Sequence, residues 1–450
     1  MIHMRLSDAA RWSCGQHLGM DVEFNGVSID SRNIGNGMLF VALRGEHCDG
    51  HQFIDAARAN GAVAALVSRP LPTTLPLLVA EQPRQALAEL ASVWRSFFDI
   101  PLIGVLGSNG KTTVKEQIAT ILKQQTQNQI LVSQGNQNNA LGVPLSLLRL
   151  SSRHTGAILE LGANQPGEIA FLGEIAKPDI AVMTNAGFDH LAGFGGREGS
   201  ALANGEVFDT MSPKGIAVLN ADDDCLPIWQ KQAGTRTQIL FGFNAQADVC
   251  GEWQPRFNGA DLRIDSPWGR INTRLHLLGR HNALNALAAT TACLMLGIDK
   301  EWVAQGLTAM RPVAGRLQSH LGAGGARIID DTYNANPSSL AAALDVMKTI
   351  AGPKILVLGD MAELGEEAAS WHIWAGQAAR AAGIAQLFPV GELAGLAAES
   401  FGAEENHFAD TQALISILRP RLKPGVTVLV KGSRCMKMEH IVAEIWRRSR

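Results

Sequence analysis

Short, mainly apolar segments recur along the middle of the chain, and stretches of helical length separate them. The segments 102–106, 156–160, 179–183 and 215–219 are nearly continuous apolar runs. Such runs are typical of parallel strands that are buried on both faces of a sheet. Their alternation with helices predicts an α/β domain with a mostly parallel sheet, which we place at residues 83–312.

The pattern changes on both sides of this region. Residues 1–82 hold short strand-like segments and one helix near 53–60, which predicts a small α/β domain. Residues 248–278 alternate polar and apolar positions between glycine and proline turns, which indicates an antiparallel ribbon. From 313 to 450 strands and helices alternate again, which predicts a Rossmann-like, doubly wound domain. No G-x-G-x-x-G follows its first strand, so we expect no nicotinamide cofactor.

Composition and charge narrow the function classes. The chain is 46% apolar and 18% charged, with a net charge of −3, so neither nucleic acid nor an anionic membrane is expected as a partner. We find neither the apolar core of a signal peptide nor a run near the ~18 residues of a membrane span, and we expect a cytoplasmic protein. The six cysteines are scattered without a C-x-x-C pair, which is typical of reduced thiols.

The segment 101–113 carries the strongest chemical signal. A strand leads into a glycine-bracketed turn, and Lys111-Thr-Thr113 then opens a helix. Backbone N–H groups in such a loop bind phosphate, the lysine reaches the outer phosphates, and a threonine hydroxyl holds magnesium. Val105 stands where the strict P-loop pattern has glycine, and a turn that only links strand to helix is the alternative. We predict nucleotide binding by Gly107, Ser108, Asn109, Gly110, Lys111, Thr112 and Thr113.

Other polar residues follow predicted strands, where open α/β sheets bind ligands. Glu160 ends an apolar strand and suits magnesium, unless it is an ordinary solvated loop charge. His190 follows the strand at 179–183, where a ligand role and a structural role are equally compatible with the pattern. Asn282 and Asn285 lie about one turn apart on a helix, where their amides bind an adenine edge or merely cap the helix.

The segment 330–337 contains the chain's single tyrosine. Tyr333 lies between two acids and two asparagines, in a chain with 15 phenylalanines and nine tryptophans. A phenol used once is expected to stack on a ligand or hydrogen-bond to it, with a buried structural tyrosine as the alternative.

Taken in order, these motifs resemble the Mur ligase family, the ATP-dependent amide-forming enzymes of peptidoglycan synthesis, over the whole chain. The segments Asp331–Pro337 and Gly359–Gly365 favour the branch that adds D-alanyl-D-alanine, and the Asp-Asn-Pro-Arg motif expected of the branch that adds diaminopimelate or lysine is absent. The resemblance also rests on Asp30-Ser-Arg32, Asn136-x-Asn-Asn139, Glu160-Leu-Gly-Ala163, His190, Gly279-Arg-His-Asn282, Gly315-Arg316 and Lys431-Gly-Ser-Arg434.

The resemblance implies a three-domain enzyme that uses ATP and Mg²⁺ to join UDP-MurNAc-tripeptide and D-alanyl-D-alanine through an acyl phosphate. We expect a UDP-sugar domain at 1–82, an ATPase domain at 83–312 and a closing domain at 313–450, in a monomer that inserts into no membrane. The implied catalytic residues are Lys111, Glu160, His190 and Arg316, and the implied metal ligands are Thr112, Glu160 and His190. Nucleotide binding is implied for the P-loop with Asn282, Arg316 and Asp331. Substrate binding is implied for Ser31, Arg32, Asn136, Asn138, Asn139, Tyr333, Asn334, Asn336, Lys431 and Arg434.

Three losses relative to the family pattern, and one additional acid, concern the magnesium site. Asn204 stands where several members carry a lysine that is carbamylated and helps to hold a metal. Ala140 and Ala192 replace an aspartate and a glutamate, and Asp189 adds an atypical acid. A slow ligase and a protein that binds without turnover therefore both stay open, as does a related ligase with another acceptor. The sequence does not distinguish diaminopimelate from lysine in the tripeptide.

Overall fold

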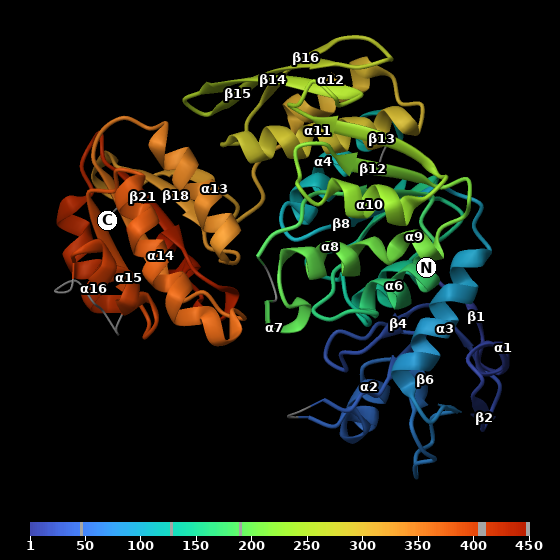
Figure 1. Cartoon of the computed structure of the whole chain (residues 1–450). Helices are drawn as coiled ribbons and strands as arrows, with labels where there is room; N and C mark the ends of the chain where they lie inside the picture. Colours follow the sequence, from blue (N-terminus) through green and yellow to red (C-terminus); the bar gives the residue numbers. More distant parts are fainter. Residues whose placement is uncertain (46–47, 127–128, 189–190, 404–410, 447–450) are drawn as a thin grey trace.

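The computed structural model comprises three α/β regions that follow one another along the chain (Figure 1). The N-terminal and C-terminal regions attach to different sides of the central one. The structure describes residues 1–45, 48–126, 129–188, 191–403 and 411–446. None of the helices within those ranges is long and apolar enough to cross a membrane.

The N-terminal region is a five-stranded sheet in the order β2-β7-β6-β5-β4. Its strands are parallel except for β2, which runs antiparallel to β7. Strands near 26–29, 38–43 and 62–67 are confirmed, whereas β2, β7 and α1 are too short to show a periodic pattern. The elements are α1 (Leu6–Trp12), β2 (Gln16–Leu18), β4 (Val27–Ser28), β5 (Met38–Val41), α2 (Ile54–Ala59), β6 (Ala62–Val67) and β7 (Leu77–Val79).

The central sheet has the order β16-β15-β14-β13-β12-β11-β8-β10-β9. It is parallel from β14 to β9, and β14, β15 and β16 form the predicted antiparallel ribbon. The strands are β8 (Leu102–Leu106), β9 (Ile130–Val132), β10 (Gly156–Glu160), β11 (Ile180–Met183), β12 (Ile216–Asn220), β13 (Thr237–Gly242), β14 (Val249–Arg256), β15 (Gly259–Asp265) and β16 (Ile271–Leu275).

Helices cover both faces of this sheet. Leu102 and Leu106 of β8 face one apolar core, and Ile103 and Val105 face the other, which explains the continuous apolar run. The first core also contains Leu66 of the N-terminal sheet, so the boundary at 82/83 crosses a shared core and stays a prediction. The helices are α3 (Pro83–Ser96), α4 (Lys111–Thr126), α5 (Gly142–Leu147), α6 (Glu168–Ala176), α7 (Leu191–Phe194), α8 (Arg197–Gly205), α9 (Val207–Thr210), α10 (Leu226–Ala233), α11 (Arg280–Met295) and α12 (Lys300–Ala309).

The C-terminal region is a five-stranded sheet in the order β17-β18-β21-β19-β20, parallel except at the edge strand β17. Helices α13 to α15 pack on one face and α16 and α17 on the other, as a doubly wound fold requires. The elements are β17 (Gln318–Leu321), β18 (Arg327–Asp331), α13 (Pro337–Lys348), β19 (Lys354–Gly359), α14 (Ala368–Ala381), β20 (Gln386–Val390), α15 (Ala394–Phe401), α16 (Thr411–Leu418), β21 (Thr427–Lys431) and α17 (Glu439–Trp446). The predicted domain boundary between residues 312 and 313 stays a prediction.

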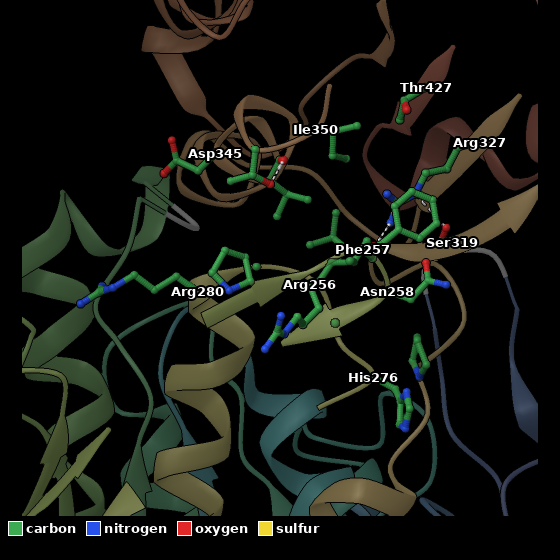
Figure 2. A pocket seen from close by; sticks show the side chains of 18 of the residues that line it. Arg256, Phe257, Asn258, His276, Arg280, Ser319, Arg327, Asp345, Ile350 and Thr427 are labelled. Carbon is green, nitrogen blue, oxygen red and sulfur yellow. Dashed lines mark hydrogen bonds between the residues drawn. The ribbon is translucent and has the colours of Figure 1, made fainter. Parts of the chain in front are cut away.

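A cleft of about 1270 Å³ separates the ribbon of the central region from the C-terminal sheet (Figure 2). Arg327 crosses one end of it: its Nη2 donates to the Phe257 carbonyl at 2.9 Å, and its guanidinium lies 4.6 Å from the Phe257 ring centre. None of the predicted site residues that the structure describes lines this cleft. The predicted nucleotide loop and Glu160 lie instead at the carboxyl ends of the central strands.

Candidate active site

The glycine-bracketed turn lies between β8 and α4, at the carboxyl edge of the central sheet. Gly107 has φ +114°, and a Cβ there would lie 2.3 Å from Thr184 Oγ1. Gly110 has φ +86°, and a Cβ there would lie 2.5 Å from Asn285 Oδ1. Both positions therefore require glycine, for the backbone conformation and for the close approach of the segment after β11 and of helix α11.

Neighbouring segments already accept hydrogen bonds from the first three N–H groups of the turn. The Gly107 N–H donates to Asn204 Oδ1 at 2.9 Å, and the Ser108 N–H donates to the Asn185 carbonyl at 2.9 Å. The Asn109 N–H donates to Asn185 Oδ1 at 3.0 Å. A helix leaves its first N–H groups without intrahelical partners, so the donors that remain for the predicted phosphate are those where α4 begins. The predicted phosphate contact is therefore limited to part of the loop, because the first three N–H groups already have acceptors in the protein.

Lys111 lies back across the turn. Its Nζ donates to the Gly107 carbonyl and to the Ser108 carbonyl, the latter at 3.1 Å. The ammonium is therefore at the mouth of the loop, where a phosphate oxygen can replace the two carbonyl oxygens as its partner.

Thr112 and Glu160, which are 48 residues apart in sequence, are in direct contact. The Thr112 hydroxyl donates to Glu160 Oε2 at 2.8 Å, and Asn138 Nδ2 donates to Glu160 Oε1 at 2.9 Å. The Glu160 side chain is only 5% exposed, with Lys115 Nζ 3.9 Å away. A hydroxyl beside a buried carboxylate offers the hard oxygen donors that Mg²⁺ prefers, so these two residues fit the implied metal.

Lys115 is a site residue that sequence reasoning missed. It is fully buried, and its Nζ donates to the Ser133 carbonyl at 2.9 Å. Its ammonium offsets part of the negative charge of Glu160 and fixes the loop after β9. The only sequence signal was its spacing of four residues from Lys111, which places both lysines on one face of α4.

His190 and Asp189 lie outside the described residues, so their predicted contribution to the metal site stays a prediction. Thr184 and Asn185, which directly follow β11 in the same segment, do reach the turn. Thr184 Oγ1 donates to the Asn109 carbonyl at 2.8 Å, and Asn185 Nδ2 donates to the same carbonyl at 2.9 Å.

The two asparagines of α11 are buried next to each other. Asn285 Nδ2 donates to Asn282 Oδ1 at 3.2 Å, and Asn282 Nδ2 donates to the Leu278 carbonyl at 2.7 Å. Because Asn285 also lies against Gly110, the structure brings this pair to the predicted nucleotide loop. Binding of adenine by Asn282 stays a prediction.

Arg316 and Tyr333 stack on each other. The guanidinium of Arg316 lies 4.0 Å from the Tyr333 ring centre, and the Tyr333 N–H donates to the Gly315 carbonyl at 3.1 Å. Arg434 approaches the same ring at 5.9 Å. The chain's single tyrosine therefore supports a cluster of cations, in addition to its predicted ligand contact.

Asp331 forms a buried ion pair with Lys431, whose Nζ lies 2.6 Å from Asp331 Oδ2. Lys431 is 1% exposed, and it also donates to the Asn334 carbonyl at 3.0 Å. Burial lowers the pKa of Lys431, and the neighbouring Asp331 carboxylate opposes that shift. This placement makes Lys431 a support for the 331–334 segment. The predicted direct contact of Lys431 with substrate is untested, and the geometry does not favour it.

The predicted substrate residues divide into two groups. Ser31 and the exposed Arg32 lie in the N-terminal region, where the Arg32 guanidinium lowers the pKa of Asp30 to about 2 through two hydrogen bonds of 2.9 Å. Asn136 and Asn139 are exposed, whereas Asn138 contacts Glu160.

The C-terminal group lies across the domain contact. Asn336 Oδ1 accepts from the Ser339 N–H at the start of α13, and its Nδ2 donates to Asn109 Oδ1 at 3.1 Å. Asn334 and Arg434 are exposed. Substrate binding by this set stays a prediction, but Asn336 does join the C-terminal region to the nucleotide loop.

Family models match three consecutive parts of the chain. The model described as "Mur ligase family, catalytic domain" matches residues 23–95. "Mur ligase middle domain" matches residues 105–293, and "Mur ligase, glutamate ligase domain" matches residues 315–434.

Full-length relatives and solved structures agree with these matches. The chain is 40% identical to the UDP-N-acetylmuramoyl-tripeptide–D-alanyl-D-alanine ligase of Escherichia coli K12, with 98% of each chain covered. It is 33% identical to the enzyme of the same name from Bacillus subtilis 168, with 94% and 93% covered. The crystal structure of MurF from Acinetobacter baumannii superposes with a TM-score of 0.92 at 32% identity, over 99% of each chain. MurF from Thermotoga maritima in complex with ADP gives 0.82 at 28%, over 94% and 97%.

Proposed function

Because this chain belongs to the Mur ligase family, we propose that it adds D-alanyl-D-alanine to UDP-MurNAc-tripeptide at the expense of ATP. The reaction forms one amide bond in the precursor of peptidoglycan. Full-length identity of 33–40% to relatives named for this activity supports the assignment. The direct contact between Thr112 and Glu160 beside Lys111 is the observation in this chain that carries it.

The chemistry has two balanced steps. The terminal carboxylate of the tripeptide attacks the γ-phosphorus of ATP, which gives an acyl phosphate and releases ADP. The free amine of D-alanyl-D-alanine then attacks the acyl carbon, loses a proton, and expels inorganic phosphate. Both reactants of the first step are anions, so catalysis depends on cations and on positioning.

Each residue of the site has a place in this scheme. Lys111 binds the β- and γ-phosphates, and the N–H groups at the start of α4 hold the phosphate oxygens. Arg316, stacked on Tyr333, offers a guanidinium that is pre-oriented toward the nucleotide phosphates. Asn282 binds adenine and Asp331 the ribose. Ser31, Arg32 and the loop with Asn136 and Asn139 bind the UDP-sugar, and Asn334, Asn336 and Arg434 bind the peptide ends.

Thr112 and Glu160 would hold Mg²⁺, with His190 as the predicted third ligand. When bound, Mg²⁺ neutralises charge that develops on the phosphate oxygens. Asn138 and Lys115 orient the Glu160 carboxylate for this task. We also propose that the protein works in the cytoplasm, where ATP is available, and as a monomer.

The presence of Asn204 favours one alternative of another class, a protein that binds nucleotide and UDP-sugar without turnover. In such a protein, the uncharged amide of Asn204 would stand in place of an anionic metal ligand. A related ligase with another acceptor is the remaining alternative, and full-length similarity to D-alanyl-D-alanine ligases counts against it.

Phosphate release from MgATP, measured with UDP-MurNAc-tripeptide and D-alanyl-D-alanine and with each component omitted in turn, tests the proposal. We expect release only in the complete mixture, with UDP-MurNAc-pentapeptide as the product. Nucleotide binding without product would establish the binding protein instead. Parallel reactions with diaminopimelate- and lysine-containing tripeptides identify the third residue.

A further inference from the structure

Two polar residues of α8 contact the nucleotide loop from the side of the protein core. Ser200 and Asn204 are four residues apart, so they lie on one face of the helix, and both are buried. Asn204 Oδ1 accepts from the Gly107 N–H at 2.9 Å, and the Ser200 hydroxyl lies 3.1 Å from the Ser108 hydroxyl. The contact joins segments more than 90 residues apart in sequence.

The Asn204 amide is oriented by its own helix. Its Nδ2 donates to the Ser200 carbonyl at 2.8 Å, which directs Oδ1 toward the Gly107 N–H. A buried N–H without an acceptor is unfavourable, so a side chain that cannot accept a hydrogen bond here leaves Gly107 unsatisfied. Lysine is such a side chain, because its ammonium is a donor only.

Helix α8 is itself firmly attached. Arg197, at its first residue, donates from Nε to the Ala186 carbonyl at 2.8 Å and from Nη2 to Asp223 at 3.1 Å. Trp229, fully buried on α10, donates its indole N–H to the Ala201 carbonyl at 3.0 Å. The helix can therefore hold Gly107 and Ser108 at a fixed position relative to the sheet.

We propose that Asn204, with Ser200, is a positioning residue that holds the nucleotide loop in its phosphate-binding shape before the nucleotide arrives. Its amide is committed to the protein backbone at both ends, and it does not act as a metal ligand. The inference rests on the proposed ligase function only in identifying the ligand of the loop as ATP. With this role, an uncharged residue at position 204 is compatible with full activity.

A loop that is ordered in advance costs less conformational entropy when the nucleotide binds. Loss of the Asn204 contact should therefore weaken nucleotide binding and raise KM for ATP, while kcat at saturating ATP stays within a few-fold. A structural defect that reduces the folded fraction would instead lower kcat and leave both KM values unchanged.

The first experiment compares the full-length protein with Asn204→Leu, which keeps the branched shape and the number of non-hydrogen side-chain atoms and removes the acceptor. We expect MgADP, titrated by calorimetry, to bind about ten-fold more weakly, and KM for ATP to rise about as much. KM for the UDP-substrate should not change. Backbone hydrogen exchange at Gly107 should become faster. Leu202→Ala is the matched control, because Leu202 lies on the same helix and is 52% exposed.

Asn204→Lys, assayed with and without bicarbonate, tests the opposite role. We expect it to weaken MgADP binding in both conditions, because it also removes the acceptor. A rate or magnesium affinity that rises in bicarbonate would overturn the proposal, as would unchanged MgADP binding in Asn204→Leu. If Asn204→Leu does not fold, Ser200→Ala replaces it, with an expected weakening of about three-fold, and unchanged MgADP binding and exchange in that variant would equally overturn the proposal.

These readouts distinguish failure of the proposed ligase function from failure of the positioning role of Asn204. If the wild-type protein binds MgADP but makes no pentapeptide, the proposed function fails, and the MgADP titrations still decide the role of Asn204. If the wild-type protein is active and the variants bind MgADP normally, only the positioning role fails.

Discussion

At the scale of single residues, the site depends on the buried carboxyl group of Glu160. The Thr112 hydroxyl and the Asn138 amide donate hydrogen bonds to it, and the Lys115 ammonium lies 3.9 Å away. These contacts fix the carboxyl group relative to the nucleotide loop.

Glu160→Gln therefore tests the charge without changing the shape of the side chain. We expect kcat/KM to fall by about 100-fold or more, since loss of residues that only support a metal ligand already costs 10- to 100-fold. Pentapeptide formation at several Mg²⁺ concentrations measures this, and higher Mg²⁺ should recover part of the rate. Glu174→Gln, an exposed carboxyl on α6, is the control and should retain wild-type activity. Equal rates in the wild type and Glu160→Gln would remove Glu160 from the site.

His281 makes stability depend on pH. Burial lowers its pKa to about 4, with a smaller opposing effect of the Asp331 carboxylate. Between pH 6.5 and 4 the unfolded chain binds a proton that the folded chain does not, so the free energy of unfolding falls as the pH falls through this window. The maximum contribution is about 3 kcal/mol.

Urea unfolding at pH 7 and at pH 4.5 measures this effect, and His281→Gln removes the titrating group. The difference in unfolding free energy between the two pH values should be smaller in the variant, because the remaining carboxyl groups titrate alike in both proteins. An identical difference in both proteins would show that His281 takes up its proton as readily folded as unfolded.

At the scale of elements, apolar runs predicted four parallel strands of the central sheet but missed β13. A parallel strand that is buried on both faces has no alternating pattern, and Leu102–Leu106 is apolar at all but one position. Strands β2 and β17 (Gln318–Leu321) were not predicted. Both are short edge strands that are only partly buried, so they show no apolar run.

The site was predictable only where it lies within one motif or at a strand end. Lys111 and Thr112 belong to one turn, and Glu160 ends a neighbouring strand. The contacts of Asn185 and Asn204 with the turn depend instead on which strands are neighbours and on where α8 packs, and these are properties of the sheet order. Asn204 was visible in the sequence as a departure from a family pattern, but its partner Gly107 was not.

The N-terminus of α13 joins two elements that belong to different regions. Asn336 caps the helix through Oδ1 and reaches Asn109 of the nucleotide loop through Nδ2. Asn336→Ala loses both interactions and should lower the free energy of unfolding by about 1 kcal/mol. Asn336→Asp keeps the cap and loses only the donor to Asn109.

We therefore expect Asn336→Asp to unfold in urea like the wild type but to show an altered KM for ATP, whereas Asn336→Ala should show both defects. Ser416→Ala, an exposed position of α16, is a control for both assays. A normal KM for ATP in Asn336→Asp would mean that the bond to Asn109 does not matter for nucleotide binding.

At the scale of the whole molecule, the described parts of the C-terminal and central regions share several contacts, and two of them include hydrogen bonds between the regions. One contact is at the nucleotide loop, where Asn336 reaches Asn109 and the Phe188 N–H donates to Ser338 Oγ at 3.1 Å. The other is at the tip of the ribbon, where Arg327 holds Phe257 (Figure 2). A rotation of the C-terminal region that closes one side must strain the contact on the other.

Arg327→Ala should therefore release the ribbon and widen the range of domain arrangements. Burial lowers the pKa of Arg327, and its guanidinium is bound by the Phe257 carbonyl and the Ser319 hydroxyl, so the contact is specific in geometry. Small-angle scattering of the nucleotide-free protein should show a larger radius of gyration in the variant, and saturating MgADP should reduce the difference because it binds at the other contact. Arg421→Ala, which removes a similar cation–π contact within the C-terminal region, should leave the scattering unchanged. Identical scattering curves for the wild type and Arg327→Ala would show that the Arg327 contact does not restrict the domain arrangement.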